Sequence, residues 1–310
     1  MNLWLILLFL IVGFFIGFIF YQNSKLKIIA GYIVHFGLLF LIFVMGAQIG
    51  ADDEVINNLG KTGIQALILA LGTIVGSLLL LQLFSVIFMK IIDKNQKQAN
   101  KIKNKESNIM MLTIQILFIV VSGILVGLLI MPQDAIPVLE SLTVLSLGVL
   151  LLGVGVEIGQ NKKIYKEIKI LGFKILLIPI IVAIGSIFGG IVSGYLIGLP
   201  YNESAAVGSG FGWYSLSAVI LTDVHSVELG SLAFMTNIIR ELLALVMIPI
   251  TATYVSKLSA IAPGGATTMD VTLPLITKAS GEEYIVPAFI NGLVLSVLVP
   301  VLVPILITVS

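Results

Sequence analysis

The stretch IIAGYIVHFGLLFLIFVMGAQI, residues 28–49, decides the class of fold. It contains no Asp, Glu, Lys or Arg, and it exceeds the roughly 20 apolar residues that cross a bilayer as an α-helix. Across all 310 residues, 58% are hydrophobic and 11% are charged, whereas about a quarter are charged in a soluble domain. We therefore predict an all-α polytopic membrane protein of about eight transmembrane helices. The spans are expected at residues 3–21, 28–49, 62–89, 109–131, 136–158, 170–196, 229–255 and 284–309.

The lysines orient these spans. Two lysines follow the first span, six lie in residues 90–105 and four in residues 162–169, while the alternate loops carry acids such as Asp134 and Glu203. Because cytoplasmic loops are enriched in Lys and Arg, we predict that both termini lie outside. The run at residues 90–105 is expected to be an orienting loop, with a lipid-binding or regulatory role as the alternative.

An internal repeat supports this topology. GAQIG at residues 46–50 recurs as GVEIG at residues 155–159, and further matches follow at the same offset. One residue out of phase, Gly13 and Gly17 match Gly123 and Gly127. Each unit holds three spans, an odd number, so the second unit is inverted, as in many secondary transporters. We predict that residues 1–200 form two inverted three-helix units.

The last third of the chain has a different composition. Residues 205–221 and 263–280 are rich in Gly, Ser, Thr and Pro, and each stretch precedes an apolar span. Irregular backbone at membrane depth occurs only where protein or a watery cavity satisfies its polar groups. We therefore predict that residues 201–310 form two inverted units, each a re-entrant hairpin followed by one helix, and that they carry the substrate site.

The only arginine, Arg240, lies beside Glu241 in the middle of a predicted span. A charge at the centre of a membrane helix is costly, so both residues need partners. Asn237 shares their helix face at a spacing of three and four residues. One interpretation is a substrate or proton site, and the other is a structural Arg–Glu pair.

The segment GSGFGWYSLS, residues 208–217, combines exposed backbone with aromatic rings. Its glycines permit close approach, and Trp213 and Tyr214 offer faces that attract cations. Ser209, Gly210 and Ser215 complete this candidate set. Close helix packing by small residues is the alternative explanation.

A second segment, PGGATTMDVTLP at residues 263–274, places Asp270 among Gly265, Thr267 and Thr268. Free helix ends in a broken segment can hold charged ligand groups. Asp270 would then bind an amine or coupling cation, or it would instead cap the following helix. Asn291, in the last span, is also a candidate.

The acidic run at residues 52–54 is either a solvated loop or part of an exit path for a cation. The chain has no cysteine and only two histidines, His35 and His225, without zinc-site spacing. Nucleotide-binding motifs and a nucleophile–base pair are also absent from the sequence. We expect no metal, cofactor, nucleic-acid partner or enzymatic activity, and we expect an ion gradient or the substrate's own gradient to supply energy.

Three segments resemble the signature sequences of the LysO lysine exporter family. They are GSGFGWYSLS, NIIRELLALVMIPI at residues 237–250, and GGATTMDVTLP at residues 264–274, where Thr268 replaces a serine and keeps the hydroxyl. The resemblance extends to MGAQIGADDEVINNL at residues 45–59. It implies export of L-lysine and of analogues such as thialysine across the bacterial inner membrane. It also implies that intramembrane acids are central, here Glu241 and the loop aspartate Asp53.

Residues and resemblance together suggest a secondary transporter with alternating access. Lysine is expected between the two hairpins, with its α-carboxylate on backbone amides and on hydroxyls such as Ser209, Ser215 or Thr267. Its ammonium groups are expected on Glu241 or Asp270, and the proton is the expected coupling ion. The alternatives are an ion-coupled carrier of another solute, such as a carboxylate, and a passive channel; a homo-oligomer is left open.

Overall fold

The computed structural model describes residues 3–21, 23–53, 56, 61–92, 106–160 and 172–309. Most of the two long basic stretches, together with Glu54, lies outside the described residues. The described part is helical and contains no strand. Its α-helices are α1 (Leu3–Ile19), α2 (Ser24–Ala51), α4 (Lys61–Ile92), α5 (Glu106–Ile130), α6 (Ile136–Gln160), α8 (Leu177–Leu196), α9 (Tyr201–Gly208), α10 (Tyr214–Val224), α11 (Val227–Tyr254), α12 (Leu273–Ser280) and α13 (Ile285–Thr308). Short 3₁₀ turns include η1 (Gln133–Ala135), η2 (Gly172–Leu176), η3 (Ser259–Ile261), η4 (Gly265–Met269) and η5 (Glu282–Tyr284).

Seven of the described helices are long and apolar enough to cross a bilayer. They fall in the last seven of the eight predicted spans, and the first predicted span forms the 17-residue helix α1. Their lipid-facing sides carry exposed Leu, Ile, Val and Phe side chains, as expected of helices whose solvent is hydrocarbon. The prediction of an all-α polytopic membrane protein is confirmed.

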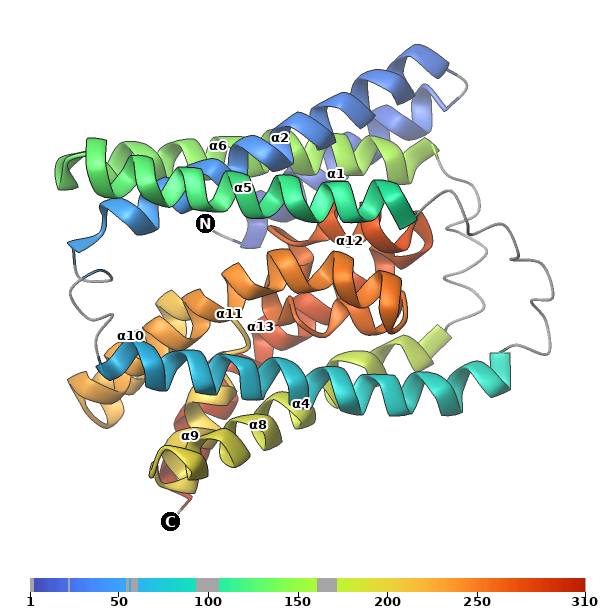
Figure 1. Ribbon diagram of the computed structural model, residues 1–310. Helices are drawn as coiled ribbons and strands as arrows, with labels where there is room; N and C mark the ends of the chain where they lie inside the picture. Colours follow the sequence, from blue (N-terminus) through green and yellow to red (C-terminus); the bar gives the residue numbers. More distant parts are fainter. Residues whose placement is uncertain are drawn as a thin grey trace.

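The six described α-helices that precede residue 200 pack in pairs. Helix α1 lies against α6, α2 against α5, and α4 against α8 (Figure 1). The first helix of each three-helix unit thus packs against the second helix of the other unit, and the two third helices pack against each other. A two-fold relation between the units would produce this pattern. The inverted relation itself stays a prediction.

Glycines from the repeated motifs lie in these helix contacts. A Cβ atom on Gly50 would lie 2.1 Å from a backbone oxygen of α5, and one on Gly155 would lie 2.4 Å from one of α1. A Cβ on Gly76 would lie 2.2 Å from a backbone oxygen of α8. Helix association in lipid relies on close packing by such small residues, so the repeat reflects helix–helix contacts.

The two segments predicted as hairpins are broken helices. In hairpin 1, α9 and α10 are separated by residues 209–213; in hairpin 2, η3, η4 and α12 follow one another with short interruptions. The breaks touch each other, because the N–H of Ala266 donates to the carbonyl of Phe211 at 2.8 Å. Phe211 adopts a φ of 50° and Gly265 one of 56°, a left-handed backbone that is rare for a bulky residue such as Phe. Figure 1 shows α10 near one end of the bundle and α12 toward the other.

The helices form two groups in space. Helices α1, α2, α5 and α6 make one, while α4 and α8 pack against α11 and α9 and so lie with the last third of the chain. The proposed division of the sequence at residue 200 stays a prediction. The second group, which we call the hairpin group, therefore contains the third helix of each three-helix unit, α4 and α8, together with the last third of the chain.

Candidate functional site

A cavity of about 510 Å³ lies between the two helix groups. One wall is the end of α2, where Met45, Gln48, Ile49 and Asp52 face inward. These positions are spaced three or four residues apart, so they share one face of the helix. The first half of α6 supplies the adjoining wall with the same spacing, at Ile136, Glu140, Thr143 and Leu147.

The remaining wall comes from the hairpin breaks and from α11 and α13. Gly212, Trp213, Tyr214 and Ser215 line it from hairpin 1, and residues 266, 267 and 269–271 line it from hairpin 2. Six of the predicted site residues therefore meet in one cavity: Trp213, Tyr214, Ser215, Glu241, Thr267 and Asp270.

Four carboxylates and no basic side chain occur among the described residues that line the cavity. The acids are Asp52 of α2, Glu140 of α6, Glu241 of α11 and Asp270 of hairpin 2. Glu241 of α11 and Asp270 of hairpin 2 line the same cavity. Because like charges in a low-dielectric site repel strongly, a cation or a proton is needed to stabilise this pair.

Hairpin 1 offers the cavity the start of a helix. Helix α10 begins at Tyr214, and no side chain caps its first turn. The first N–H groups of an α-helix have no partner within the helix and carry its positive dipole end. The Tyr214 ring is held edge-on to Phe234, with centroids 5.5 Å apart. This edge of the cavity is therefore suited to an anionic group.

Hairpin 2 places Asp270 directly after η4. Its Oδ1 accepts a hydrogen bond from the N–H of Val271 at 2.6 Å. The N-cap position of α12 is Thr272, whose side chain makes no capping bond. Asp270 thus bonds the N–H that follows it and also borders the cavity.

Arg240 points away from the cavity, although Glu241 faces it. The guanidinium is fully buried and donates to Ser186 Oγ of α8 at 2.5 Å. It also donates to the carbonyls of Ala262 and Pro263 at 3.4 Å each. No Arg240–Glu241 ion pair occurs among the described residues. Neighbouring residues of an α-helix point about 100° apart, which separates the two charges onto different faces.

Two asparagines stabilise the breaks. Asn237 of α11 accepts a hydrogen bond from the N–H of Gly212 at 2.7 Å. Asn291 of α13 donates to the carbonyl of Gly265 and to Thr268 Oγ1, at 3.0 Å each. These side chains are fully buried, so they replace the backbone partners that a continuous helix would supply.

Comparison with known proteins identifies the family of this chain. The family described as "Lysine exporter LysO" matches residues 7–104 and 117–307. The chain belongs to the LysO lysine exporter family. It is 30% identical to Lysine exporter LysO of Escherichia coli (strain K12) over 303 residues, 96% of each chain. It is 37% identical over 147 residues to a Haemophilus influenzae protein described as "Putative lysine exporter", covering 47% of this chain and 74% of that one. No solved structure matches it significantly. Membership of this family makes the chain a transporter of the export class.

In this LysO-family chain, the remaining predicted residues Ser209, Gly210 and Asp53 do not line the cavity. Ser209 and Gly210 are buried within hairpin 1, where Ser209 Oγ donates to the carbonyl of Ala206 at 2.8 Å. Asp53 is exposed and does not line the cavity, whereas its neighbour Asp52 does. Asp52 belongs to the acidic run at residues 52–54 that the sequence offered as an exit path, whereas Glu140 was not predicted. Asp52 lies four residues after Gln48 and seven after Met45, a spacing that places all three on the same side of the helix.

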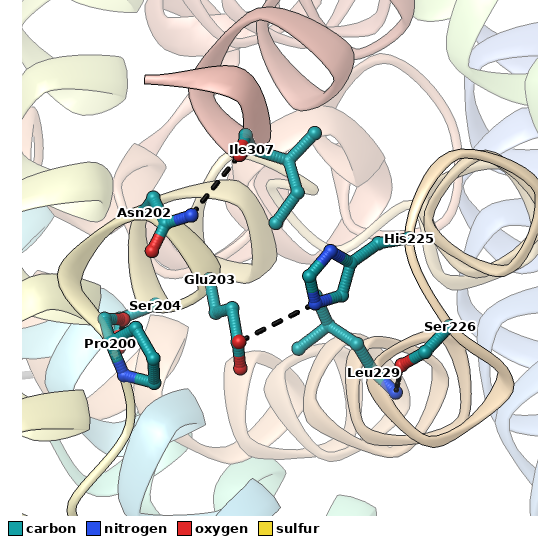
Figure 2. Close-up of polar contacts among 8 residues, drawn as sticks. All are labelled: Pro200, Asn202, Glu203, Ser204, His225, Ser226, Leu229 and Ile307. Carbon is teal, nitrogen blue, oxygen red and sulfur yellow. Dashed lines mark hydrogen bonds and ion pairs between the residues drawn. The ribbon is translucent and has the colours of Figure 1, made fainter. Parts of the chain in front are cut away.

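The ends of hairpin 1 are tied to each other and to α13 (Figure 2). His225 Nε2, just after α10, lies 3.4 Å from Glu203 Oε1 of α9. Asn202 Nδ2 donates to the carbonyl of Ile307 at 3.1 Å, and Ser226 Oγ caps α11 by accepting from the N–H of Leu229 at 3.2 Å. These contacts connect the two limbs of hairpin 1 at the ends that lie away from its break.

Proposed function

We propose that the chain exports L-lysine, and analogues such as thialysine, from the bacterial cytoplasm as a secondary transporter. The observation that carries the proposal is the cavity with four carboxylates and no basic residue among its described lining. Lysine carries two ammonium groups and one carboxylate. A cavity with this charge attracts the ammonium groups, and membership of a family described as lysine exporters supports the same cargo.

The binding mode follows from the positions of the charges. The α-carboxylate of lysine is placed at the uncapped start of α10, next to the Ser215 hydroxyl. The ammonium groups are placed at Glu241 and Asp270, where they neutralise two acids that otherwise repel each other. Trp213 and Tyr214 add aromatic faces beside the cation.

The proton is the proposed coupling ion. When lysine leaves, the Glu241–Asp270 pair loses its counter-charge in a buried site, and protonation is the simplest replacement. Exchange of lysine for protons then requires the cavity to open alternately to the two sides. We place the protein in the inner membrane with both termini outside and with inverted units in each region, as the lysine distribution and the paired helix contacts suggest.

The two alternative functions fit the cavity less well. A carrier of an anionic solute would need basic groups at the site, and the buried Arg240 is engaged with Ser186 and two carbonyls. A passive channel would conduct without saturation, whereas a site built between broken helices is typical of secondary transporters.

The test is lysine transport in proteoliposomes, with matched control substitutions. Glu241→Gln and Asp270→Asn should each reduce lysine flux by at least about tenfold, since removing one partner of a buried charge pair costs roughly 2–5 kcal/mol. Glu228→Gln and Asp223→Asn alter exposed acids at the ends of α11 and α10, so they should leave the flux unchanged. Lysine-driven proton movement, followed with a pH-sensitive dye inside the vesicles, tests the coupling.

Unchanged lysine flux in Glu241→Gln, at normal protein levels, would refute the assignment of Glu241. Saturating flux with counterflow identifies a carrier, and flux that rises linearly with concentration identifies a channel. Lysine flux without any proton movement would refute antiport while leaving the cargo intact.

A further inference from the structure

The cavity occupies only part of the interface between the two helix groups. It reaches the surface near Asp52 and Glu140, of which Glu140 is exposed. Its innermost lining residues on α2 and α6 are Met45 and Leu147. Beyond that level, α12 of hairpin 2 contacts both α2 and α6.

A second polar cluster lies where α12 meets α2 and α6. The Nζ of Lys278, from α12, contacts Nδ1 of His35, from α2. Glu157, from α6, acts electrostatically on the Lys278 ammonium. Glu157 also lies close to α2, because a Cβ atom built on Gly31 would be 4.0 Å from Glu157 Oε1. Gly31 is one helical turn from His35. Three helices from both groups therefore meet around one ammonium group.

The cluster lies well away from the cavity floor. His35 precedes Met45 and Glu157 follows Leu147 by ten residues each, which is about 15 Å along either helix at ~1.5 Å per residue. Hairpin 2 therefore carries Asp270 at the cavity and Lys278 at the cluster. A movement of hairpin 2 relative to α2 and α6 that exceeds the reach of the Lys278 side chain would break this contact.

We propose that His35 and Glu157 form a loading site for a primary ammonium group, and that Lys278 occupies it while the cavity is open near Asp52 and Glu140. This inference rests on lysine being the cargo, because the side chain of Lys278 is chemically the same as that of free lysine. An ionised carboxylate at membrane depth is stabilised by a counter-charge. When hairpin 2 moves and withdraws Lys278, an incoming lysine supplies that charge; once the lysine has moved on toward Glu241, Lys278 returns.

Transport kinetics from the inner side test the loading site. Glu157→Gln should raise the half-saturation concentration for lysine by about tenfold, because a hydrogen bond to a charged group is lost. Glu157→Asp, which keeps the charge, should recover most of this loss. Lys278→Met should lower the maximal rate without raising the half-saturation concentration. Lys257→Met is the matched control, since Lys257 is a lysine near hairpin 2 that pairs with Glu283 at the surface, 3.7 Å away.

A labelling experiment tests the closure without requiring lysine transport. The chain has no cysteine, so a single cysteine introduced at Thr143 reports on access to the cavity. With a membrane-impermeant maleimide added at the Asp52 side, Lys278→Met should slow labelling at least about twofold, and Lys257→Met should not change it.

The proposal is overturned if Lys278→Met leaves the labelling rate unchanged, or if Glu157→Gln leaves the half-saturation concentration unchanged. If the unsubstituted protein transports no lysine, the proposed cargo fails. In that case, the labelling rate alone decides whether Lys278 holds the interface closed at the end opposite Asp52.

Discussion

Replacing Arg240 by methionine should destabilise the fold strongly while leaving lysine recognition intact. The guanidinium is 1% exposed and donates to Ser186 Oγ at 2.5 Å and to the carbonyls of Ala262 and Pro263 at 3.4 Å. Ser186 Oγ also donates to the carbonyl of Gly208, and Ala262 O also accepts from the N–H of Gly265. Two of the three acceptors therefore keep another partner.

The expected cost can be worked from these contacts. A buried acceptor that loses its partner costs about 1–3 kcal/mol, and Pro263 O loses the most. The other two acceptors each keep another partner and so lose less, which raises the total only to about 2–4 kcal/mol. For a chain of this size, the apparent Tm should fall by roughly 3–6 °C.

The assay is thermal unfolding of detergent-purified Arg240→Met, combined with the half-saturation concentration for lysine in proteoliposomes. Arg240→Lys, which keeps one charge but not the forked geometry, should fall between the variant and the unsubstituted protein in stability. The reasoning is refuted if Arg240→Met keeps its Tm within about 2 °C yet loses lysine affinity, because Arg240 would then act on the cargo.

Three further predictions concern other parts of the structure. Gly76→Leu should abolish membrane accumulation of folded protein, measured by fluorescence-detected size exclusion, because its Cβ would lie 2.2 Å from the Gly185 carbonyl; normal accumulation would contradict the α4–α8 contact. Asp52→Asn should reduce lysine export more than Asp53→Asn, measured as growth on thialysine, because only Asp52 lines the cavity; the reverse order would favour the loop aspartate. Asn237→Ala should lower the apparent Tm by about 2–5 °C, since the buried N–H of Gly212 loses its 2.7 Å partner, and an unchanged Tm would contradict this role.

The sequence predicted the fold well because a bilayer leaves few choices. Long apolar runs must form helices that satisfy their own backbone, and the seven long apolar helices among the described residues coincide with predicted spans. The broken segments were also recognisable, since their Gly, Ser, Thr and Pro content excludes a regular lipid-facing helix. Hairpin 2 shows the limit: its η3, η4 and α12 pieces depend on contacts with Asn291 and Arg240 that composition does not reveal.

Some of the residues that line the candidate cavity were predicted from the sequence. Glu241, Asp270 and the aromatic pair at residues 213 and 214 were identified because charge and unusual composition at membrane depth require an explanation. Glu140 was missed because an acid near a helix end is ordinary at a membrane surface, and only the packing of α6 against the hairpin group turns it into a cavity residue. Periodicity gives the face of a helix, but it does not say which neighbour that face meets.

The Arg240–Glu241 pair shows how adjacent charges can have separate roles. A carrier of a cation is hindered by a fixed cation in its cavity, because the two would compete for the same acids. The broken helices, however, expose carbonyls such as Ala262 O and Pro263 O that a buried donor must satisfy. One helical step, about 100°, points Arg240 at these carbonyls and Glu241 at the cavity. The same α11 register thus stabilises hairpin 2 and leaves the acids of the cavity available to a cationic cargo.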